Sequence, residues 1–266
     1  MNRQERRKQE KIPKKENKPL SLEMSIDLLQ PWSVPVMRTR LPLYVLDRML
    51  EISEGMISDE NSISHGPRLA GQIKTELTID TELLKKNDLD KFFHAMIKQF
   101  VILAKTQKTP YKKEEIQKET WLSQMDSMWV ISQKPGEYNP IHFHTECQIS
   151  AVMYLKLPKF LPSEKKHRAG DDGAITFVSN SSKDKDFSDP TITIRPFVGD
   201  FFIFGANQLH SVNPYKCEEG DSERRSVSFN ANFMSQTDYY NEQKKKEMEK
   251  GYSWVTDKKE DEQKEM

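Results

Sequence analysis

The sequence contains few of the features that mark secreted or membrane-embedded proteins. It has two cysteines, Cys147 and Cys217, whose spacing fits no metal-binding or redox motif. Two isolated cysteines argue against a disulfide framework, so we expect a reducing, cytoplasmic compartment. No apolar run approaches the roughly 20 residues that a membrane-spanning helix needs. The basic N-terminal stretch lacks the apolar segment of a signal peptide, so we expect neither secretion nor a membrane partner.

Net charge and phosphate-binding motifs are missing as well. The chain has 41 Lys and Arg residues and 41 Asp and Glu residues, so its formal net charge is zero. Without a basic excess, the chain as a whole has no general affinity for nucleic-acid phosphates. No glycine-rich phosphate loop or Walker pattern occurs in the sequence. These absences disfavour a nucleic-acid partner and leave small-molecule substrates open.

The charge that is present lies largely at the two ends of the chain. Charged residues make up 31% of the sequence and apolar residues 35%, which is modest for a globular protein. Residues 1–19 are rich in Lys, Arg and Glu and are predicted to form a disordered tail. Residues 241–266 form a second charged tail. Residues 20–240 are predicted to be one domain, whose β-rich core spans about 121–233.

The first half of the expected domain has the apolar periodicity of helices. One helix is predicted to begin at Pro42, because proline is favoured in a first helical turn. A second helix is predicted after Asn87 or Asp88, either of which can cap its N-terminus. The apolar faces expected for these two helices are Leu43, Leu46, Leu50 and Ile57, and Leu89, Phe93, Met96, Phe100 and Leu103.

From Trp121 onward the pattern changes to short strands separated by Gly, Pro, Asn and Asp. The eight predicted strands are Met125–Gln133, Ile141–His144, Ile149–Leu157, Ala174–Val178, Thr191–Ile194, Phe201–Phe204, His210–Asn213 and Arg225–Phe233. Many short strands after a helical segment indicate an α+β, mostly β fold. We expect a double-stranded β-helix, the jelly-roll or cupin-like core, with the N-terminal helices packed against one sheet.

Three histidines lie in this β-rich region. His142 and His144 are two residues apart in a predicted strand, so both side chains should point to the same face. Two imidazoles on one face can chelate a transition metal. His210 lies in a second strand-like context far downstream and can supply a third nitrogen ligand. The sequence therefore predicts a mononuclear metal site.

Several segments carry a resemblance to a known family, and they occur in the family's order. They are 134–144 (KPGEYNPIHFH), 150–155 (SAVMYL), 173–177 (GAITF), 196–204 (PFVGDFFIF), 210–214 (HSVNP) and 223–230 (ERRSVSFN). Together they resemble the iron(II)- and 2-oxoglutarate-dependent oxygenases, and among these a prolyl-hydroxylase-like group found in bacteria and phages. The resemblance covers roughly residues 121–233.

The resemblance implies an enzyme that hydroxylates a C–H bond, with Fe(II) and 2-oxoglutarate as cofactors. His142 would be the first metal ligand and His210 the distal one. Arg224 and Tyr154 would bind the far carboxylate of 2-oxoglutarate. The strand pattern supports this role for Arg224, which shares a strand face with Ser226 and Ser228 in a polar row suited to a barrel interior. The implied substrate is a proline or another amino-acid, peptide or small-molecule group.

The second metal ligand departs from the family's pattern and leaves two alternatives. The family usually has an acid two residues after the first histidine, where this chain has His144. Either His144 itself is a ligand, or the register shifts and Glu146 supplies the carboxylate. Three neutral imidazoles would leave more positive charge on the metal than a set with a carboxylate.

Two further functions remain open at this stage. One is a three-histidine, cupin-like dioxygenase that works without 2-oxoglutarate. The other is a non-catalytic metal-binding scaffold protein whose charged tails bind partners. The sequence predicts neither the oligomeric state nor the identity of the substrate.

Overall fold

A computed structural model describes residues 35–161, 171–179, 190–218, 220 and 222–246. The chain divides into two units, residues 1–33 and 34–266, and the first unit lies outside the described residues. The predicted tail at 1–19 therefore lies outside them too, as does most of the predicted tail at 241–266. The proposed boundaries of the domain stay predictions. Residues 236–246 are helical.

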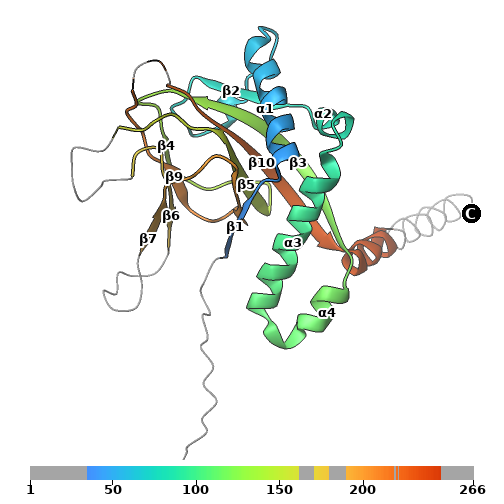
Figure 1. Cartoon of the computed structure of the whole chain (residues 1–266). Helices are drawn as coiled ribbons and strands as arrows, with labels where there is room; N and C mark the ends of the chain where they lie inside the picture. The colour runs from blue at the N-terminus through green and yellow to red at the C-terminus, as the bar shows by residue number, and fades with distance from the viewer. Residues whose placement is uncertain (1–34, 162–170, 180–189, 219, 221, 247–266) are drawn as a thin grey trace, which may run out of the picture. The chain divides into compact units, whose positions relative to one another are not determined.

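The second unit is built on two antiparallel sheets. The larger has the strand order β1-β8-β5-β10-β3-β2, and the smaller has the order β4-β9-β6-β7. The strands of the larger sheet are β1 Val36–Arg40, β2 Thr75–Ile79, β3 Trp121–Gln133, β5 Ile149–Lys156, β8 Asp200–Gly205 and β10 Arg224–Ser235. Those of the smaller sheet are β4 Asn139–His142, β6 Ile175–Val178, β7 Thr191–Ile194 and β9 His210–Val212. Figure 1 shows the two sheets side by side.

All eight strands predicted from the sequence are present, with ends that differ by a few residues. The largest difference is in β3, which begins at Trp121 and pairs along its length with β10. The second predicted strand ends earlier than expected, since β4 stops at His142 and leaves His144 in the following loop. Strands β1 and β2 extend the larger sheet at its two edges.

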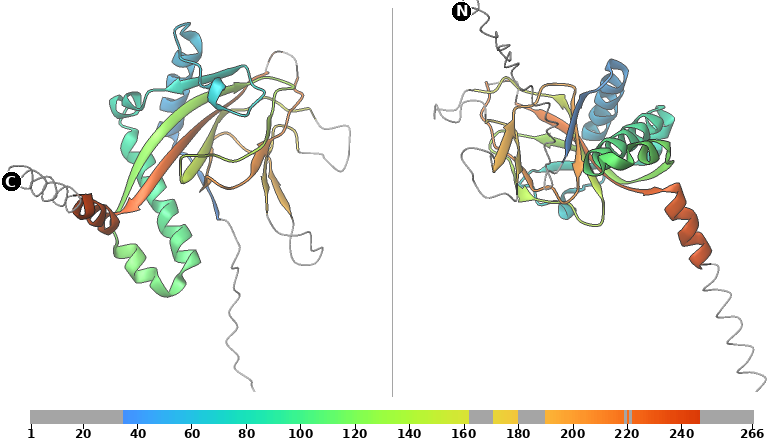
Figure 2. Two further views of the ribbon diagram at one scale, coloured as in Figure 1. Left: turned by 180° about the vertical axis from the view of Figure 1, so that it is seen from behind. Right: turned by 90° about the horizontal axis from the view of Figure 1, so that it is seen from below.

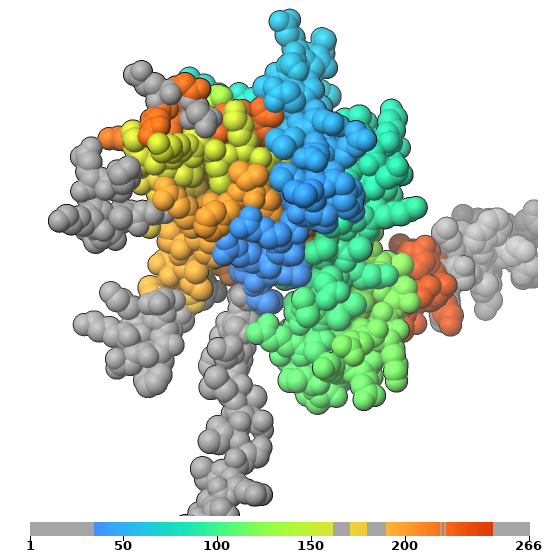
Figure 3. Space-filling view, viewed as in Figure 1, coloured from blue at the N-terminus to red at the C-terminus, as the bar shows by residue number. Residues whose placement is uncertain are grey.

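Helices cover one face of the larger sheet. They are α1 Leu43–Ser58, α2 Thr81–Lys86, α3 Asp90–Lys108 and α4 Lys113–Lys118, with short 3-10 turns at Gly66–Arg68 and Pro110–Lys112. Seen from below, the helices gather on one side of the strands (Figure 2). In the space-filling view, α1 and α3 occupy much of the face nearest the viewer (Figure 3). No helix among the described residues is both long and apolar enough to cross a membrane.

The helix faces that pack on the sheet differ in part from the predicted ones. Leu43 at the start of α1 is 77% exposed and Leu103 of α3 is 50% exposed, although both were expected to be buried. Val45 and Met49 form the buried face of α1 instead, and Ile97 lies on that of α3. The predicted face is otherwise largely correct for α3, where Leu89, Phe93 and Phe100 are buried. In α1 the predicted Leu46, Leu50 and Ile57 pack against the core but are only partly buried.

Two apolar cores result from this arrangement. The larger joins the helices to the outer face of the big sheet, where the Phe93 ring meets Phe201 and Phe229 edge-on at centroid distances of 6.3 and 5.8 Å. The smaller joins the inner face to the four-stranded sheet through residues such as Tyr154 and Phe177. The predicted mostly β, jelly-roll architecture with helices on one sheet is thereby confirmed.

Candidate metal centre

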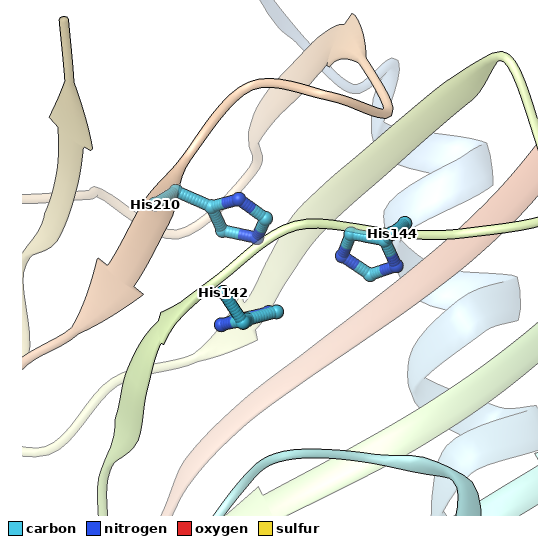
Figure 4. A group of neighbouring side chains, drawn as sticks. All are labelled: His142, His144 and His210. Carbon is cyan, nitrogen blue, oxygen red and sulfur yellow. The ribbon is translucent and has the colours of Figure 1, made fainter. Parts of the chain in front are cut away.

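Three histidines converge on one point, two from strands of the smaller sheet and one from the loop after β4. His142 is the last residue of β4, His144 follows two residues later, and His210 begins β9. Strands β4 and β9 pair with His142 directly opposite His210, which holds these two side chains together. The three imidazole rings point toward one another (Figure 4).

The distances fit a single ion. The ring centroids of His142 and His210 lie 4.2 Å apart, and that of His144 is 5.3 Å from each. One ligand atom from each residue lies within 4.8 Å of the others. Among the described residues this is the one group of at least three His, Cys, Asp or Glu side chains close enough to hold a metal.

Backbone carbonyls orient two of the rings. Nδ1 of His142 lies 2.7 Å from the Pro140 carbonyl, and Nδ1 of His210 lies 2.8 Å from the Gln208 carbonyl. Because a carbonyl only accepts, each Nδ1 carries the proton and each Nε2 keeps its lone pair for a metal. The loop carrying His144 is fixed by its own backbone N–H, which donates to the Ala206 carbonyl at 2.9 Å.

The surroundings keep the histidines neutral. Burial, with the neighbouring imidazoles, lowers the pKa of His144 to about 4 and that of His210 to about 3. Burial also lowers the pKa of His142. Neutral imidazole is the form that binds metal, so the group is prepared to bind a transition metal at neutral pH.

Glu146, the alternative second ligand, is placed elsewhere. Its backbone adopts a φ of 61°, in the left-handed region, and its side chain is exposed. It does not belong to the group formed by His142, His144 and His210. The geometry therefore favours three imidazoles, of which His144 is the second.

Arg224 lies in the pocket beside these histidines. The pocket is lined by the three histidines, by Arg224 and by its strand neighbours Ser226 and Ser228. The Arg224 side chain is 1% exposed, and its guanidinium lies over the Tyr154 ring at 4.8 Å from the centroid. The alternation expected for β10 is therefore present, with the polar row facing inward.

Neutral groups hold the guanidinium in a fixed orientation. Nε donates to the Gly173 carbonyl at 3.1 Å, and Nη1 donates to Oε1 of Gln133 at 2.9 Å. Gln133 is itself oriented by its amide, which donates to the Glu137 carbonyl at 2.6 Å. The Tyr215 hydroxyl accepts the backbone N–H of Arg224 at 3.1 Å.

What remains of Arg224 is an unused binding site for an anion. By hydrogen-bond geometry, neither Nη2 nor the buried Tyr154 hydroxyl has a partner among the described residues, and the two groups interact electrostatically with each other. No carboxylate of the described residues forms an ion pair with Arg224. Burial lowers the Arg224 pKa, and a buried guanidinium without an opposite charge is costly. A carboxylate bound to Nη2 and the Tyr154 hydroxyl would supply both the missing hydrogen bonds and the missing opposite charge. These residues therefore fit the distal carboxylate of 2-oxoglutarate.

Arg225, the next residue, has a different role. It lies on the opposite face of β10 and is 4% exposed. Its guanidinium binds Glu223 at 2.8 Å and Glu54 of α1 at 2.6 Å. Arg225 thus joins the sheet to the helix layer and is paired with two carboxylates. Arg224 has no acidic partner within the described ranges.

Sequence reasoning missed the residues that support Arg224. Gln133 appeared only as the end of a strand, and Tyr215 lies in a loop where no pattern singles it out. It also missed Glu76 and Trp129, which line the same pocket from β2 and β3. Cys147 lies close to His144 in sequence, but burial raises the pKa of its thiol to about 11, so it is not a nucleophile at neutral pH.

Comparison with known proteins agrees with this site. Residues 127–230 match the model of a family described as "Putative 2OG-Fe(II) oxygenase". The matched segment contains the three histidines, Tyr154 and Arg224. The resemblance predicted from the sequence is confirmed for this segment. The family takes its description from Fe(II) and 2-oxoglutarate, the two cofactors that the resemblance implies. No curated protein matches the chain.

Several solved structures align with about three quarters of the chain. A prolyl-4-hydroxylase from Pseudomonas putida shares 16% identity over 75% of this chain and 94% of its own, with a TM-score of 0.43. The α-ketoglutarate-dependent epimerase SnoN of nogalamycin biosynthesis shares 16% identity over 76% of this chain and 78% of its own, with a TM-score of 0.47. A viral collagen prolyl hydroxylase from Paramecium Bursaria Chlorella virus-1 shares 13% identity over 74% and 94%, with a TM-score of 0.41.

Proposed function

We propose that the chain is an iron(II)- and 2-oxoglutarate-dependent dioxygenase that hydroxylates a C–H bond. His142, His144 and His210 would hold the iron, and Arg224 with Tyr154 would hold 2-oxoglutarate. The iron supplies the site at which dioxygen is activated, and three protein ligands leave positions open for cosubstrate and oxygen. The substrate would be a prolyl group or another amino-acid, peptide or small-molecule group.

One observation carries the proposal. A buried guanidinium with no counter-charge among the described residues shares a pocket with three neutral imidazoles. A metal site alone would not need such a cation, because the cation repels the metal. A dianionic cosubstrate that binds both explains why the two occur together.

The protein's own groups have definite tasks in this reaction. Arg224 and Tyr154 orient one end of 2-oxoglutarate, so that its other end is presented to the metal. The apolar residues around them, such as Val152 and Ile175, exclude water from the pocket. In overall balance, R–H, dioxygen and 2-oxoglutarate give R–OH, succinate and carbon dioxide. One oxygen atom enters the alcohol and the other enters succinate.

The second candidate function is a three-histidine dioxygenase that works without 2-oxoglutarate. The observation that favours it is His144, which stands where the resembling family has an acid. The two functions differ in their need for Arg224. Replacement of Arg224 should abolish an activity that depends on 2-oxoglutarate and should leave the other activity intact.

The proposal is tested by turnover. The protein is purified without oxygen, supplied with Fe(II) and 2-oxoglutarate, and then exposed to air while succinate is measured. We expect succinate from the wild type and at least about 100-fold less from His210→Ala, since removing a ligand disrupts the metal site.

A second histidine provides the matched control. His94 of α3 is partly buried, hydrogen-bonds with the Ser123 hydroxyl at 2.8 Å and does not line the pocket. The His94→Ala variant should form succinate at the rate of the wild type. Equal rates in His210→Ala and His94→Ala, or no Fe(II)-dependent succinate from the wild type, would refute the proposal.

A further inference from the structure

Glu76 is a buried acid whose side chain has no partner in the part of the chain that the structure describes. Its side chain lies on β2 and is 2% exposed. Neither carboxylate oxygen has a hydrogen-bond partner, and none of the described cations forms an ion pair with it. Burial, with repulsion from Glu137, raises its pKa to about 7. A carboxylate in this condition is costly to keep unless something outside the chain binds it.

Two other buried acids of this protein, unlike Glu76, have hydrogen-bond or ion-pair partners. Glu223 is 8% exposed, yet its carboxylate accepts hydrogen bonds from the Ser132 hydroxyl at 2.7 Å and from Arg225 at 2.8 Å. Asp200 is 1% exposed and pairs with Arg38 at 2.7 Å. Glu76 differs from both, because it is buried and none of the described residues donates a hydrogen bond to its side chain.

Glu76 lies in the wall of the candidate active site. Glu76 lines the pocket that contains His142, His144 and Arg224. Trp129 lines the same wall, is 2% exposed, and its indole N–H is also without a partner. The Trp129 ring lies 6.1 Å from that of His144, so this wall adjoins the metal centre. An unused acceptor and an unused donor thus share one wall.

The strand register separates this wall from the place of 2-oxoglutarate. Tyr154 of β5, Ser226 of β10, Ile131 of β3 and Glu76 of β2 are successive partners across the sheet. Such partners point to the same face, and three strand spacings amount to roughly 14 Å. Glu76 therefore lies on the same inner face as Tyr154 but at the far edge, on the opposite side of the pocket.

We propose that Glu76 binds the substrate, and that the substrate carries a cationic nitrogen group, a protonated amine or a guanidinium. The inference rests on the proposed function and names the class of its substrate. Two unpaired oxygens call for a group with several N–H donors, which an ammonium or a guanidinium has and a hydroxyl does not. The Trp129 N–H would bind an acceptor on the same substrate.

The test uses pairs of small probes that differ in charge. n-Butylguanidine and n-butylamine are cationic, while n-butylurea and n-butanol are their neutral counterparts. Each is titrated by calorimetry, without oxygen, into the full chain loaded with Fe(II) and 2-oxoglutarate. We expect each cation to bind at least about tenfold more tightly than its neutral counterpart, the usual effect of one charge-assisted hydrogen bond.

Two variants distinguish direct binding by Glu76 from a general effect of negative charge near the site. In Glu76→Gln the preference for the cations should fall at least about tenfold, while the affinity for 2-oxoglutarate stays unchanged. Glu137→Gln is the control, because the Glu137 oxygens already accept the backbone N–H groups of Lys74 and Lys134 at 3.2 and 2.8 Å. It removes the same charge nearby, and its affinity for n-butylguanidine should be equal to that of the wild type or higher.

The outcomes are distinguishable. Absence of cation binding in the wild type, equal binding of n-butylguanidine and n-butylurea, or unchanged selectivity in Glu76→Gln would overturn the inference. If the wild type binds 2-oxoglutarate in each of these cases, the proposed function stands and only the substrate class is wrong. Failure of the wild type to bind 2-oxoglutarate would refute the proposed function itself. Circular dichroism and a thermal scan establish that each variant is folded.

Discussion

At the scale of single residues, two neighbouring buried arginines have different environments. Arg224 and Arg225 are neighbours in β10, and both are almost fully buried. Arg225 is paired with Glu223 and Glu54, whereas Arg224 contacts only neutral groups among the described residues. Burying an unpaired charge reduces stability, so its presence in a pocket indicates a ligand of opposite charge.

The two arginines give the first prediction. Arg224→Lys keeps the charge but loses the planar group that can bind Gly173, Gln133 and a ligand together. We expect the dissociation constant for 2-oxoglutarate, measured by calorimetry on the Fe(II)-loaded protein, to rise about 10- to 100-fold.

Arg225→Lys is the control for this measurement. It should lower the midpoint of urea unfolding, because it weakens a buried ion pair. It should change the affinity for 2-oxoglutarate less than about twofold, since its side chain is on the other face of the sheet. Comparable losses of affinity in both variants would mean that Arg224 does not bind the cosubstrate directly.

Glu76 gives a prediction for the pH dependence of stability. Its pKa is raised from 4.5 to about 7 in the folded protein, mainly by burial. Between these two values the unfolded chain ionises and the folded one does not, so the free energy of unfolding falls as the pH rises. The penalty amounts to roughly 3–4 kcal/mol at most and is constant above the folded pKa.

The Glu76→Gln variant isolates this effect. The metal-free variant should gain stability relative to the metal-free wild type as the pH is raised from 5 to 8, because glutamine does not ionise. Urea unfolding of both proteins at the two pH values measures the difference. A difference that is the same at pH 5 and pH 8 would show that Glu76 has an ordinary pKa.

At the scale of elements, aromatic contacts join α3 to the larger sheet. Phe93 of α3 is fully buried and meets Phe201 and Phe229 of the large sheet. Leu103, one of the residues predicted for the same face, is half exposed. The stability that α3 contributes should therefore depend on Phe93 far more than on Leu103.

Two truncations measure that difference. Phe93→Ala should lower the free energy of unfolding by about 3–5 kcal/mol, the usual cost of deleting a buried phenyl ring. Leu103→Ala should cost less than about 1 kcal/mol, as exposed positions do. Both values come from urea unfolding monitored by circular dichroism. Equal costs would place the contact line of α3 elsewhere.

The strands were predictable from the sequence because they are short segments rich in β-branched residues and bounded by turn residues. Thr191–Ile194 shows this, since β7 has the predicted ends. The helix faces were less predictable, because Leu43 and Leu103 satisfy helical periodicity and yet are exposed. The proximity of His142, His144 and His210 was predictable from the spacing of the first two and from the resemblance of the surrounding segments to the oxygenase family. The role of Glu76 was not predictable, because Glu76 shares a strand face with Lys74 and Thr78 and so resembles a solvent-facing residue.

The burial of Glu76 depends on contacts that local sequence does not encode. The segment before β2 folds over this edge of the sheet, where the His65 backbone N–H donates to the Glu76 carbonyl at 2.7 Å. The His65 ring stacks on Trp129 at a centroid distance of 4.8 Å. This cover turns an edge strand into a wall of the pocket.

At the scale of the second unit, the metal centre draws on strands and loops that are distant in sequence. His142 and His210 approach only when β4 pairs with β9. A metal that binds this folded arrangement and not the unfolded chain must stabilise the fold.

Thermal unfolding tests this linkage. At a Co(II) concentration 100 times the dissociation constant, the stabilisation is about 2.7 kcal/mol, which raises Tm by about 5–10 °C for a domain of this size. Co(II) should give this shift in the wild type and in His94→Ala, but not in His210→Ala. The same shift in all three proteins would mean that the metal binds away from the three histidines.

The most direct test of the central claim is a crystal structure of the chain grown without oxygen in the presence of Fe(II) and 2-oxoglutarate. We predict a metal bound by Nε2 of His142, by His144 and by Nε2 of His210, and a 2-oxoglutarate carboxylate on Nη2 of Arg224 and the Tyr154 hydroxyl. A metal bound by Glu146 in place of His144, or a cosubstrate that does not touch Arg224, would contradict the account.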